Sequence, residues 1–389
     1  MSGTAAGLWQ NGVEALRRGD APAARIAFER LEGMGQSSHQ SRLLLAQACM
    51  MQRDDPAAQA ALDRVLAEEP TNLYALVMRG DMLQRAGNPR AAMGWHQAAL
   101  RQAPRTGQLP PDLVQALQRI ERDMTATAAA FHQRLTGQLA DAGHAAAARA
   151  PRFAEALELL AGRAEVQLQQ PTSFYYPRLP AQPFFEPSAF GWAPALEAAA
   201  PAIRAELEQV LAADDVLHPY VTAEPDRPAK RHALLGDPRW SAFHLFRAGE
   251  PIAENAARCP ATMAALAPLP IPRIAGRSPM AMFSVLRAGT HIPPHHGMLN
   301  TRLICHLPLI VPPDCRLRVG NETRAVEQGR MMIFDDSIEH EAWNDSDQTR
   351  VVLLFEIWRP ELDEGERAAL TTLFQAIGND RPAEDQAGA

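Results

Sequence analysis

The sequence predicts a multidomain protein in which an all-α repeat array precedes a β-sandwich or jelly-roll domain with flanking helices. Three observations support this prediction: a 34-residue repeat near the N-terminus, a change from Ala-rich to Pro- and aromatic-rich sequence near residue 170, and a series of short strand-like segments after residue 280. The 389 residues also exceed the size of one ordinary domain. We place the repeat array at 5–108, capping and linker helices at 109–170, the β domain at 171–365, and a C-terminal helix with a disordered tail at 366–389.

The array is indicated by three related segments, "GDAPAA" at 19–24, "RDDPAA" at 53–58 and "GNPRAA" at 87–92, whose starts lie 34 residues apart. Small residues recur with the same period at Gly12, Ala46 and Gly80, where they would let two antiparallel helices approach closely. The pattern resembles the tetratricopeptide repeat, whose arrays form concave surfaces that bind peptides or proteins. An ordinary helical bundle with accidental periodicity is the alternative.

A helical pattern continues from about residue 111 to 168 and ends at the Pro- and aromatic-rich stretch "QQPTSFYYPRLPAQPFFEPSAFGW". One more amphipathic helix is expected at about 194–212. The segments that follow are β-branched or aromatic and bounded by turn residues, which is typical of strands. They are "MAMFSVLRAG" (280–289), "TRLICHLPLIV" (301–311), "CRLRVG" (315–320), "RMMIFDD" (330–336) and "RVVLLFEIW" (350–358), with a hairpin expected at "GNET" (320–323).

Composition limits the classes of function. The formal net charge of −7 argues against a general binder of nucleic acid or membrane surfaces. The four cysteines lack C-x-x-C spacing, which fits a reducing compartment. The sequence has neither a basic-then-apolar leader nor an apolar run long enough to span a bilayer, so we expect a soluble, cytoplasmic protein.

The stretch "THIPPHHGMLNTRLICHLPL" at 290–309 contains His291, His295, His296 and His306. A jelly roll that offers histidines from two separate places can hold a divalent first-row metal, and non-haem iron oxygenases use two histidines and a carboxylate. The expected His-x-Asp or His-x-Glu is missing, because Gly297 follows His295 at that spacing. From spacing alone, Asp335 or Asp336 could supply the carboxylate.

Arg350 opens an apolar strand ten residues after His340, and a lone arginine entering a buried strand needs a carboxylate partner. A bound 2-oxoglutarate would supply one, and so would an internal ion pair with Glu356 or the Asp335–Asp336 pair. Ser284 could add a hydroxyl donor to the same group. Period-two alternation places Arg302, Ile304 and His306 on one face of their strand.

Three stretches, "SVLRAGTHIPPHHGMLNTRLICHLPLIVP", "NETRAVEQGRMMIFDDSIEHEAWND" and "RVVLLFEIWRPEL", resemble the aspartyl/asparaginyl β-hydroxylase family over roughly residues 172–362. The resemblance implies a double-stranded β-helix, a cupin-like jelly roll, that uses Fe(II), 2-oxoglutarate and O2. Family members hold iron with two histidines and have Gly where other oxygenases have the carboxylate, so Gly297 matches the family pattern.

Carried over residue by residue, the resemblance implies that His295 and His340 are the iron ligands and that Arg350 binds the distal carboxylate of 2-oxoglutarate. Ser284 would lie beside that carboxylate and His306 near the 1-carboxylate end.

Trp240 matches an aromatic residue in the wall of the cosubstrate pocket. Animal-type members have an arginine at the position of Ile304, and Arg302 on the same face is the expected substitute. His296 is expected to face solvent or substrate and His291 to open the turn. The cysteine pair of some relatives near Cys259 is incomplete, so no disulfide is expected there.

The resemblance implies decarboxylation of 2-oxoglutarate at Fe(II), coupled to hydroxylation of a substrate. The repeat array beside the oxygenase domain favours Asp or Asn residues of a peptide or protein substrate, bound in part through the array. A free amino acid or another small molecule is an alternative substrate. Relatives of this fold also hydroxylate lipid acyl chains, but the lack of an apolar run long enough to span a bilayer counts against a lipid here. A second alternative is a non-enzymatic repeat scaffold with a ligand-sensing β domain.

Overall fold

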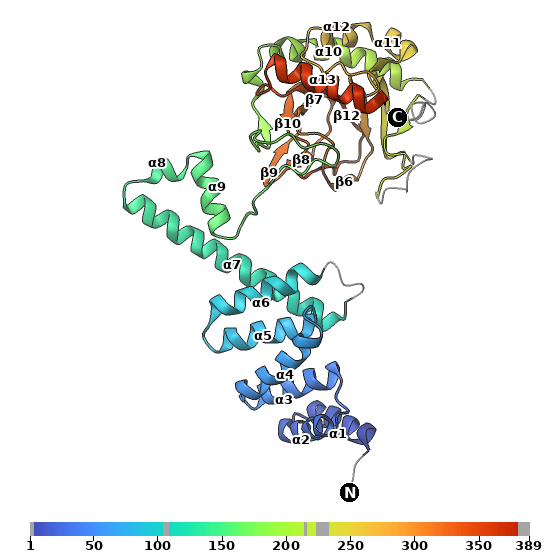
Figure 1. Cartoon of the computed structure of the whole chain (residues 1–389). Helices are drawn as coiled ribbons and strands as arrows, with labels where there is room; N and C mark the ends of the chain where they lie inside the picture. The colour runs from blue at the N-terminus through green and yellow to red at the C-terminus, as the bar shows by residue number, and fades with distance from the viewer. Residues whose placement is uncertain (1–3, 104–108, 214–215, 223–232, 380–389) are drawn as a thin grey trace. The chain divides into compact units, whose positions relative to one another are not determined.

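The computed structural model describes residues 4–103, 109–213, 216–222 and 233–379. The expected tail beyond residue 379 and the end of the expected array, residues 104–108, lie outside the described residues. The chain forms two compact units, Met1–Ala164 and Glu165–Ala389, which we call the helical unit and the β unit (Figure 1). Within the described ranges, no helix is both long enough and apolar enough to cross a membrane.

The helical unit begins with three helix pairs: α1 (Ala5–Arg17) and α2 (Ala21–Gly33), α3 (His39–Met51) and α4 (Asp55–Glu68), and α5 (Leu73–Arg85) and α6 (Pro89–Gln102). The second helix of each pair begins in the same way. Asp20, Asp54 and Asn88 each accept a hydrogen bond from the backbone N–H three residues later, and a proline follows in the first turn. These caps lie 34 residues apart, so the structure confirms the predicted helical repeat.

The small residues of the repeat lie where the two helices of a pair come closest. A Cβ added at Gly12 would stand 2.7 Å from the buried ring of Phe28, and one added at Gly80 would stand 2.2 Å from the buried ring of His96. Ala46 is fully buried in the same core as Phe28. The period of small residues is therefore a packing requirement between paired helices.

After the repeats, α7 (Pro111–Asp141) contributes Leu113, Leu117 and Ile120 to a second core shared with α5 and α6. The short α8 (Ala145–Ala148) and α9 (Pro151–Leu160) follow it. The capping helices expected from the sequence are thus present, and the first of them covers the open side of the last repeat.

The β unit contains two antiparallel sheets. The larger has the order β1-β10-β7-β12-β5-β3-β2 with β4 beside β3, and the smaller has the order β6-β11-β8-β9. The strands are β1 (Phe184–Phe185), β2 (His218–Pro219), β3 (Trp240–Arg247), β4 (Glu250–Pro251), β5 (Ala281–Leu286), β6 (Thr290–His295), β7 (Arg302–Ile310), β8 (Cys315–Val319), β9 (Glu322–Ala325), β10 (Met332–Phe334), β11 (His340–Asn344) and β12 (Arg350–Trp358). A short 3-10 helix, η2 (Pro187–Ala189), and helices α10 (Ala193–Leu211), α11 (Ala253–Arg258), α12 (Pro260–Leu266) and α13 (Glu364–Asn379) flank them (Figure 1).

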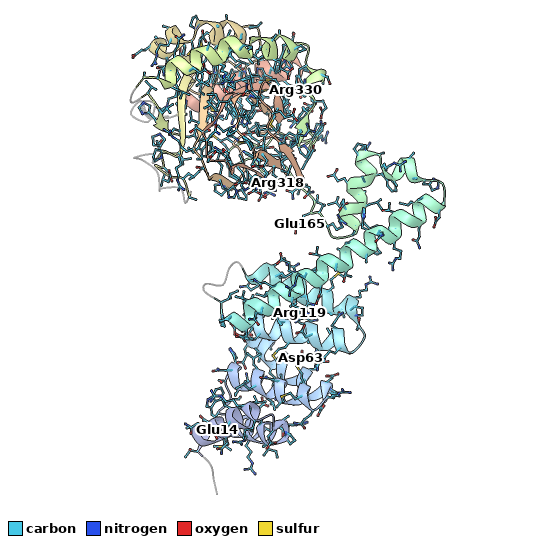
Figure 2. All side chains as sticks on the ribbon, turned by 180° about the vertical axis from the view of Figure 1, so that it is seen from behind. Glu14, Asp63, Arg119, Glu165, Arg318 and Arg330 are labelled. Carbon is cyan, nitrogen blue, oxygen red and sulfur yellow. The ribbon has the colours of Figure 1, made fainter. Side chains whose placement is uncertain are left out.

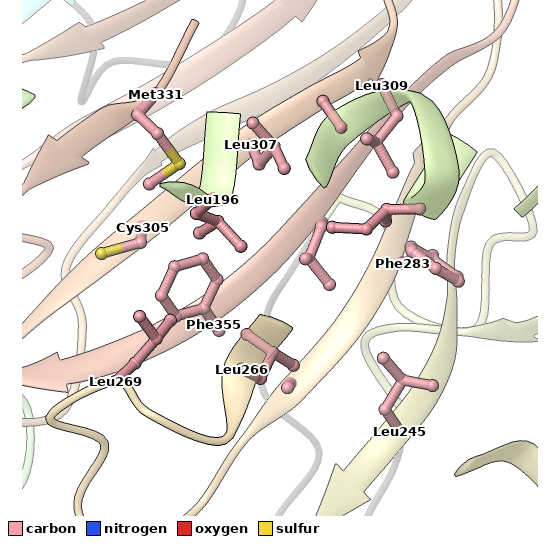
Figure 3. Close-up of a cluster of buried hydrophobic side chains, with 14 of the residues drawn as sticks. Leu196, Leu245, Leu266, Leu269, Phe283, Cys305, Leu307, Leu309, Met331 and Phe355 are labelled. Atoms are coloured by element: carbon pink, nitrogen blue, oxygen red, sulfur yellow. The ribbon is translucent and has the colours of Figure 1, made fainter. Parts of the chain in front are cut away.

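The larger sheet is covered on both faces. Cys305 and Leu307 of β7 and Phe355 of β12 pack on one face against Leu196 of α10 and Leu266 of α12, as Figure 3 shows. Residues of opposite parity face the smaller sheet instead, and we call the space between the sheets the sandwich interior. Ile304 of β7 lies there in one core with residues of β8 and β11. The structure confirms the predicted jelly roll and the shared face of Arg302, Ile304 and His306.

The packing at Gly80 predicts opposite effects for two helical glycines of one repeat. Gly80→Ala should lower the free energy of unfolding by about 1–3 kcal/mol, because the added methyl overpacks against His96. Gly94→Ala in α6 meets nothing within 4 Å, so it should raise stability by about 0.5–1 kcal/mol through the better helix propensity of Ala. Urea unfolding of both variants, followed by far-ultraviolet circular dichroism, measures the difference. Equal effects would contradict the close approach of α5 and α6.

Candidate metal and anion site

Two of the predicted site histidines lie opposite each other at the end of a strand pair. His295 ends β6, His340 begins β11, and the two residues are direct partners across the ladder, with ring centroids 4.0 Å apart. Nδ1 of His295 donates to the carbonyl of Pro293 (2.9 Å), and Nδ1 of His340 donates to the carbonyl of Ile338 (3.1 Å). With the proton on Nδ1, each neutral ring has its lone pair on Nε2. This is the tautomer that can bind a metal through Nε2.

A β-bulge turns His295 toward the sandwich interior. Ile292 pairs with Ala342 and His295 pairs with His340, so β6 has two residues where β11 has one. The extra residue lies at Pro293–Pro294, and prolines fit there because they have no N–H to offer to the ladder. The bulge therefore reverses the alternation of side chains between His291 and His295.

His291 consequently lies on the outer face of the smaller sheet. Its ring stacks on Trp343 at 5.0 Å, and its Nε2 is 2.7 Å from a carboxylate oxygen of Glu341. The expectation that His291 opens a turn is thus wrong, since it lies within β6. The paired prolines hide the strand pattern in the sequence.

Burial keeps the inner histidines neutral. Desolvation and the neighbouring His295 hold the pKa of His340 well below its usual range. Burial, with a smaller contribution from the charge of Arg350, lowers the pKa of His306 to about 3. The ring of His306 packs edge-on against Phe334 at 5.0 Å, and its Nδ1 has no hydrogen-bond partner among the residues described. Neutral imidazoles suit metal or anion binding at physiological pH.

The missing carboxylate is explained by Asp336. A side chain at Gly297 would place its Cβ 2.0 Å from Oδ2 of Asp336, so an Asp or Glu at position 297 would collide with it. Burial, opposed by the charge of Arg302, raises the pKa of Asp336 to about 6. Among the residues that the structure describes, no three or more His, Cys, Asp or Glu side chains are arranged to hold a metal ion together.

Arg350 is buried, and no anionic partner for it is found among the described residues. The residue is only 1% exposed, and its Nε and one terminal nitrogen make no hydrogen bond to any of those residues. Burial lowers the pKa of Arg350 to about 10, so the group remains charged at neutral pH. An orphaned buried cation is costly, and a bound carboxylate would satisfy it.

The internal ion pairs considered for Arg350 are formed by other arginines. Glu356 and Asp336 both pair with Arg302, and Asp335 pairs with the fully buried Arg359 at 2.6 Å. No described residue forms an ion pair with Arg350. Arg302, expected to contact the cosubstrate, has its charge balanced by these carboxylates instead.

The remaining predicted residues lie around Arg350 and the histidines. Ser284 of β5 is opposite Val352 of β12, and its Oγ accepts a hydrogen bond from Nε1 of Trp240 at 3.2 Å. The ring of Trp240 lies 6.2 Å from His295. Ile304 is buried in the sandwich interior and offers no polar group. His296 is partly exposed beyond the end of β6.

Two aromatic residues of this site were missed by the sequence analysis. Phe334 lies between His306 and His340, at 5.0 and 5.7 Å. Tyr220 stacks on Trp240 at 4.3 Å. Phe334 belongs to a segment with the pattern of an ordinary apolar strand, and Tyr220 belongs to a loop without a recognisable motif. The sequence therefore offers no indication that either residue lies at the site.

Comparisons with known proteins give the same region an evolutionary context. Residues 197–360 match the sequence model of the Aspartyl/Asparaginyl beta-hydroxylase family. The chain is 39% identical over 188 residues to the ornithine lipid ester-linked acyl 2-hydroxylase of Rhizobium tropici, covering 48% of this chain and 63% of that protein. It is 38% identical over 136 residues to the human aspartyl/asparaginyl beta-hydroxylase, covering 34% and 18%. Human aspartate beta-hydroxylase domain-containing protein 2 is 32% identical over 212 residues, covering 53% and 55%. The chain spans less than two thirds of the length of each of these relatives.

The orphaned charge of Arg350 predicts an unusual stability effect. Arg350→Met should raise the free energy of unfolding of the metal-free protein by about 1–3 kcal/mol, because it removes unsatisfied buried donors. The matched variant Arg359→Met should lower it by about 3–5 kcal/mol, because it leaves Asp335 buried without its partner. Urea unfolding without 2-oxoglutarate measures both. A strong loss of stability in Arg350→Met would mean that the arginine has a protein anion as its partner.

Proposed function

We propose that this protein is a hydroxylase dependent on Fe(II), 2-oxoglutarate and O2, because residues 197–360 of the β unit match the sequence model of the aspartyl/asparaginyl β-hydroxylase family. One observation carries the proposal: a facing pair of metal-competent histidines and a buried arginine, for which the described residues offer no anion, lie around the same sandwich interior. The ring of Phe334 links the two groups, because it packs against both His306 and His340.

In this proposal His295 and His340 hold the iron through Nε2, while the carbonyls of Pro293 and Ile338 fix the ring orientations. Arg350 binds the distal carboxylate of 2-oxoglutarate in bidentate geometry, with the hydroxyl of Ser284 beside it. His306 offers its Nδ1 at the other end of the cosubstrate. Fe(II), when bound, supplies the chemistry that couples decarboxylation of 2-oxoglutarate to hydroxylation of a substrate C–H bond.

The protein's contribution is binding, orientation and exclusion of water. The rings of Trp240 and Phe334 pack beside His295 and His340 and keep bulk water away from them. The lower local dielectric strengthens the interaction between Arg350 and a carboxylate. Asp336 occupies the space that a carboxylate side chain at position 297 would need, so the two histidines would be the protein's ligands to the metal. The two-histidine ligand set is therefore part of how the site is built.

We infer that the substrate is an Asp or Asn residue of a peptide or protein, in line with the names of several relatives. The helical repeats support this choice, because arrays of this kind form concave surfaces that bind peptides or proteins. The similarity to the ornithine lipid hydroxylase supports a second candidate, hydroxylation of an acyl chain. We propose a cytoplasmic location.

The decisive assay is release of succinate from 2-oxoglutarate by the full chain with Fe(II), ascorbate and oxygen. A lysate peptide fraction and ornithine-lipid vesicles serve as alternative substrates. His295→Ala and His340→Ala should abolish turnover, and His291→Ala, from the same strand as His295 but on the outer face, should retain it. Stimulation by vesicles alone would replace the peptide with the acyl chain as substrate.

Arg350→Met should act on cosubstrate binding. It should raise the Kd for 2-oxoglutarate about 10- to 100-fold, the worth of a charge-assisted bidentate pair, while metal affinity stays near that of the unmodified protein. Isothermal titration with 2-oxoglutarate and a redox-inert divalent metal measures it. Absence of both metal and 2-oxoglutarate binding in the unmodified chain would favour the non-enzymatic scaffold.

A further inference from the structure

The first residues of the β unit form an extended segment, Glu165–Tyr176, which we call the strap. It has no regular secondary structure of its own apart from one bridge residue. Glu165 marks its start and is labelled in Figure 2. The strap hydrogen-bonds to the chain segments that flank both site histidines.

The strap binds the segment that leaves His295. The backbone N–H of Thr172 donates to the carbonyl of Gly297 at 2.9 Å, and the Thr172 hydroxyl donates to the same oxygen at 3.3 Å. The N–H groups of Ser173 and Phe174 both donate to the carbonyl of Met298 at 3.0 Å. Phe174 also pairs in parallel with Leu299. The strap thus lies alongside residues 297–299 as a short added strand.

The strap also binds the turn that leads into His340. The N–H of Gln170 donates to the carbonyl of Ser337 at 2.7 Å, and the Gln169 side chain donates to Asp335 at 2.7 Å. The same Gln169 amide accepts a hydrogen bond from Asn300 at 3.0 Å. Gln169 therefore joins the segment after His295 to the turn before His340 through one side chain.

These contacts act where the ladder between the histidines ends. His295 and His340 are the last pair of β6 and β11, and beyond them the chain continues into the 297–300 segment and the 335–338 turn. One backbone bond joins the two directly, from the N–H of Gly297 to the carbonyl of Asp336 at 2.6 Å. A metal site needs its ligands held to about half an ångström, which a frayed ladder end does not provide.

We propose that the strap positions His295 and His340 for metal binding, with Gln169 and Thr172 as positioning residues. This inference rests on the proposed metal site. The first residues of the β unit are then a structural part of the site, although they contribute no metal ligand.

Titration of the full chain with Co(II), followed by its visible absorption, tests the strap separately from turnover. Thr172→Pro, which removes both donors to Gly297, and Gln169→Met, which removes the link between the two segments, should each raise the Kd for Co(II) at least tenfold. Thr172→Ser, which keeps both donors, should retain the affinity. Gln182→Met is the matched control, because it also removes a glutamine hydrogen bond, to the carbonyl of Phe184, outside the strap.

Each variant is titrated well below its melting temperature, with near-ultraviolet circular dichroism as the check on folding. If Thr172→Pro does not fold, Gln169→Met decides. Wild-type affinity in the folded strap variants, beside a loss of binding in His340→Ala, would overturn the positioning role and leave the proposed site intact. Absence of Co(II) binding in the unmodified chain would overturn both.

Discussion

The charge of Arg350 is the constraint on which the β unit depends. A guanidinium buried between two sheets needs an anion, and the nearby carboxylates are each held by another arginine: Asp335 by Arg359, and Glu356 and Asp336 by Arg302. Within the described part of the unit, this positive charge therefore has no counter-ion from the protein. A structural ion pair would have been the simpler solution, so we interpret its absence from the described contacts of Arg350 as the mark of a carboxylate-binding site.

Around that charge, the metal-competent groups come from the smaller sheet and the anion-binding groups from the larger one. His295 and His340 belong to β6 and β11, whereas Ser284, His306 and Arg350 belong to β5, β7 and β12. The pairing of two sheets across one interior is what brings them together. The outer face of the larger sheet packs its apolar side chains against α10 and α12, which anchors the strands that carry the anion-binding groups.

Much of this architecture could be predicted from the sequence. The 34-residue period and its capping residues determine the helical pairs, and period-two alternation places Arg302, Ile304 and His306 on one face. The last strand, Arg350–Trp358, matches the predicted segment. The family resemblance supplied roles for these residues, but spacing alone left the partner of Arg350 open, because ion pairing between distant strands depends on register.

Other features had no local signal. The alternation rule places His291 and His295 on the same face, and only the pairing with β11 reveals the bulge that separates them. The sequence of the strap has the composition of a proline-rich linker. Its role could not be predicted, because its hydrogen bonds come from backbone groups and from amides whose partners lie far along the chain. The ion pairs of Arg302 also depend on the joint positions of β7, β10 and β12.

The bulge at Pro293–Pro294 has a consequence for how this sequence can change over evolutionary time. Ile292 packs in the sandwich interior, and the bulge lets His295 share that face although it lies three positions later. Loss of one residue between them would place His295 two positions after Ile292, so strict alternation would keep it on the interior face and opposite His340. Homologous chains that lack one residue between Ile292 and His295 should therefore keep the histidine pair, in a regular ladder without the bulge.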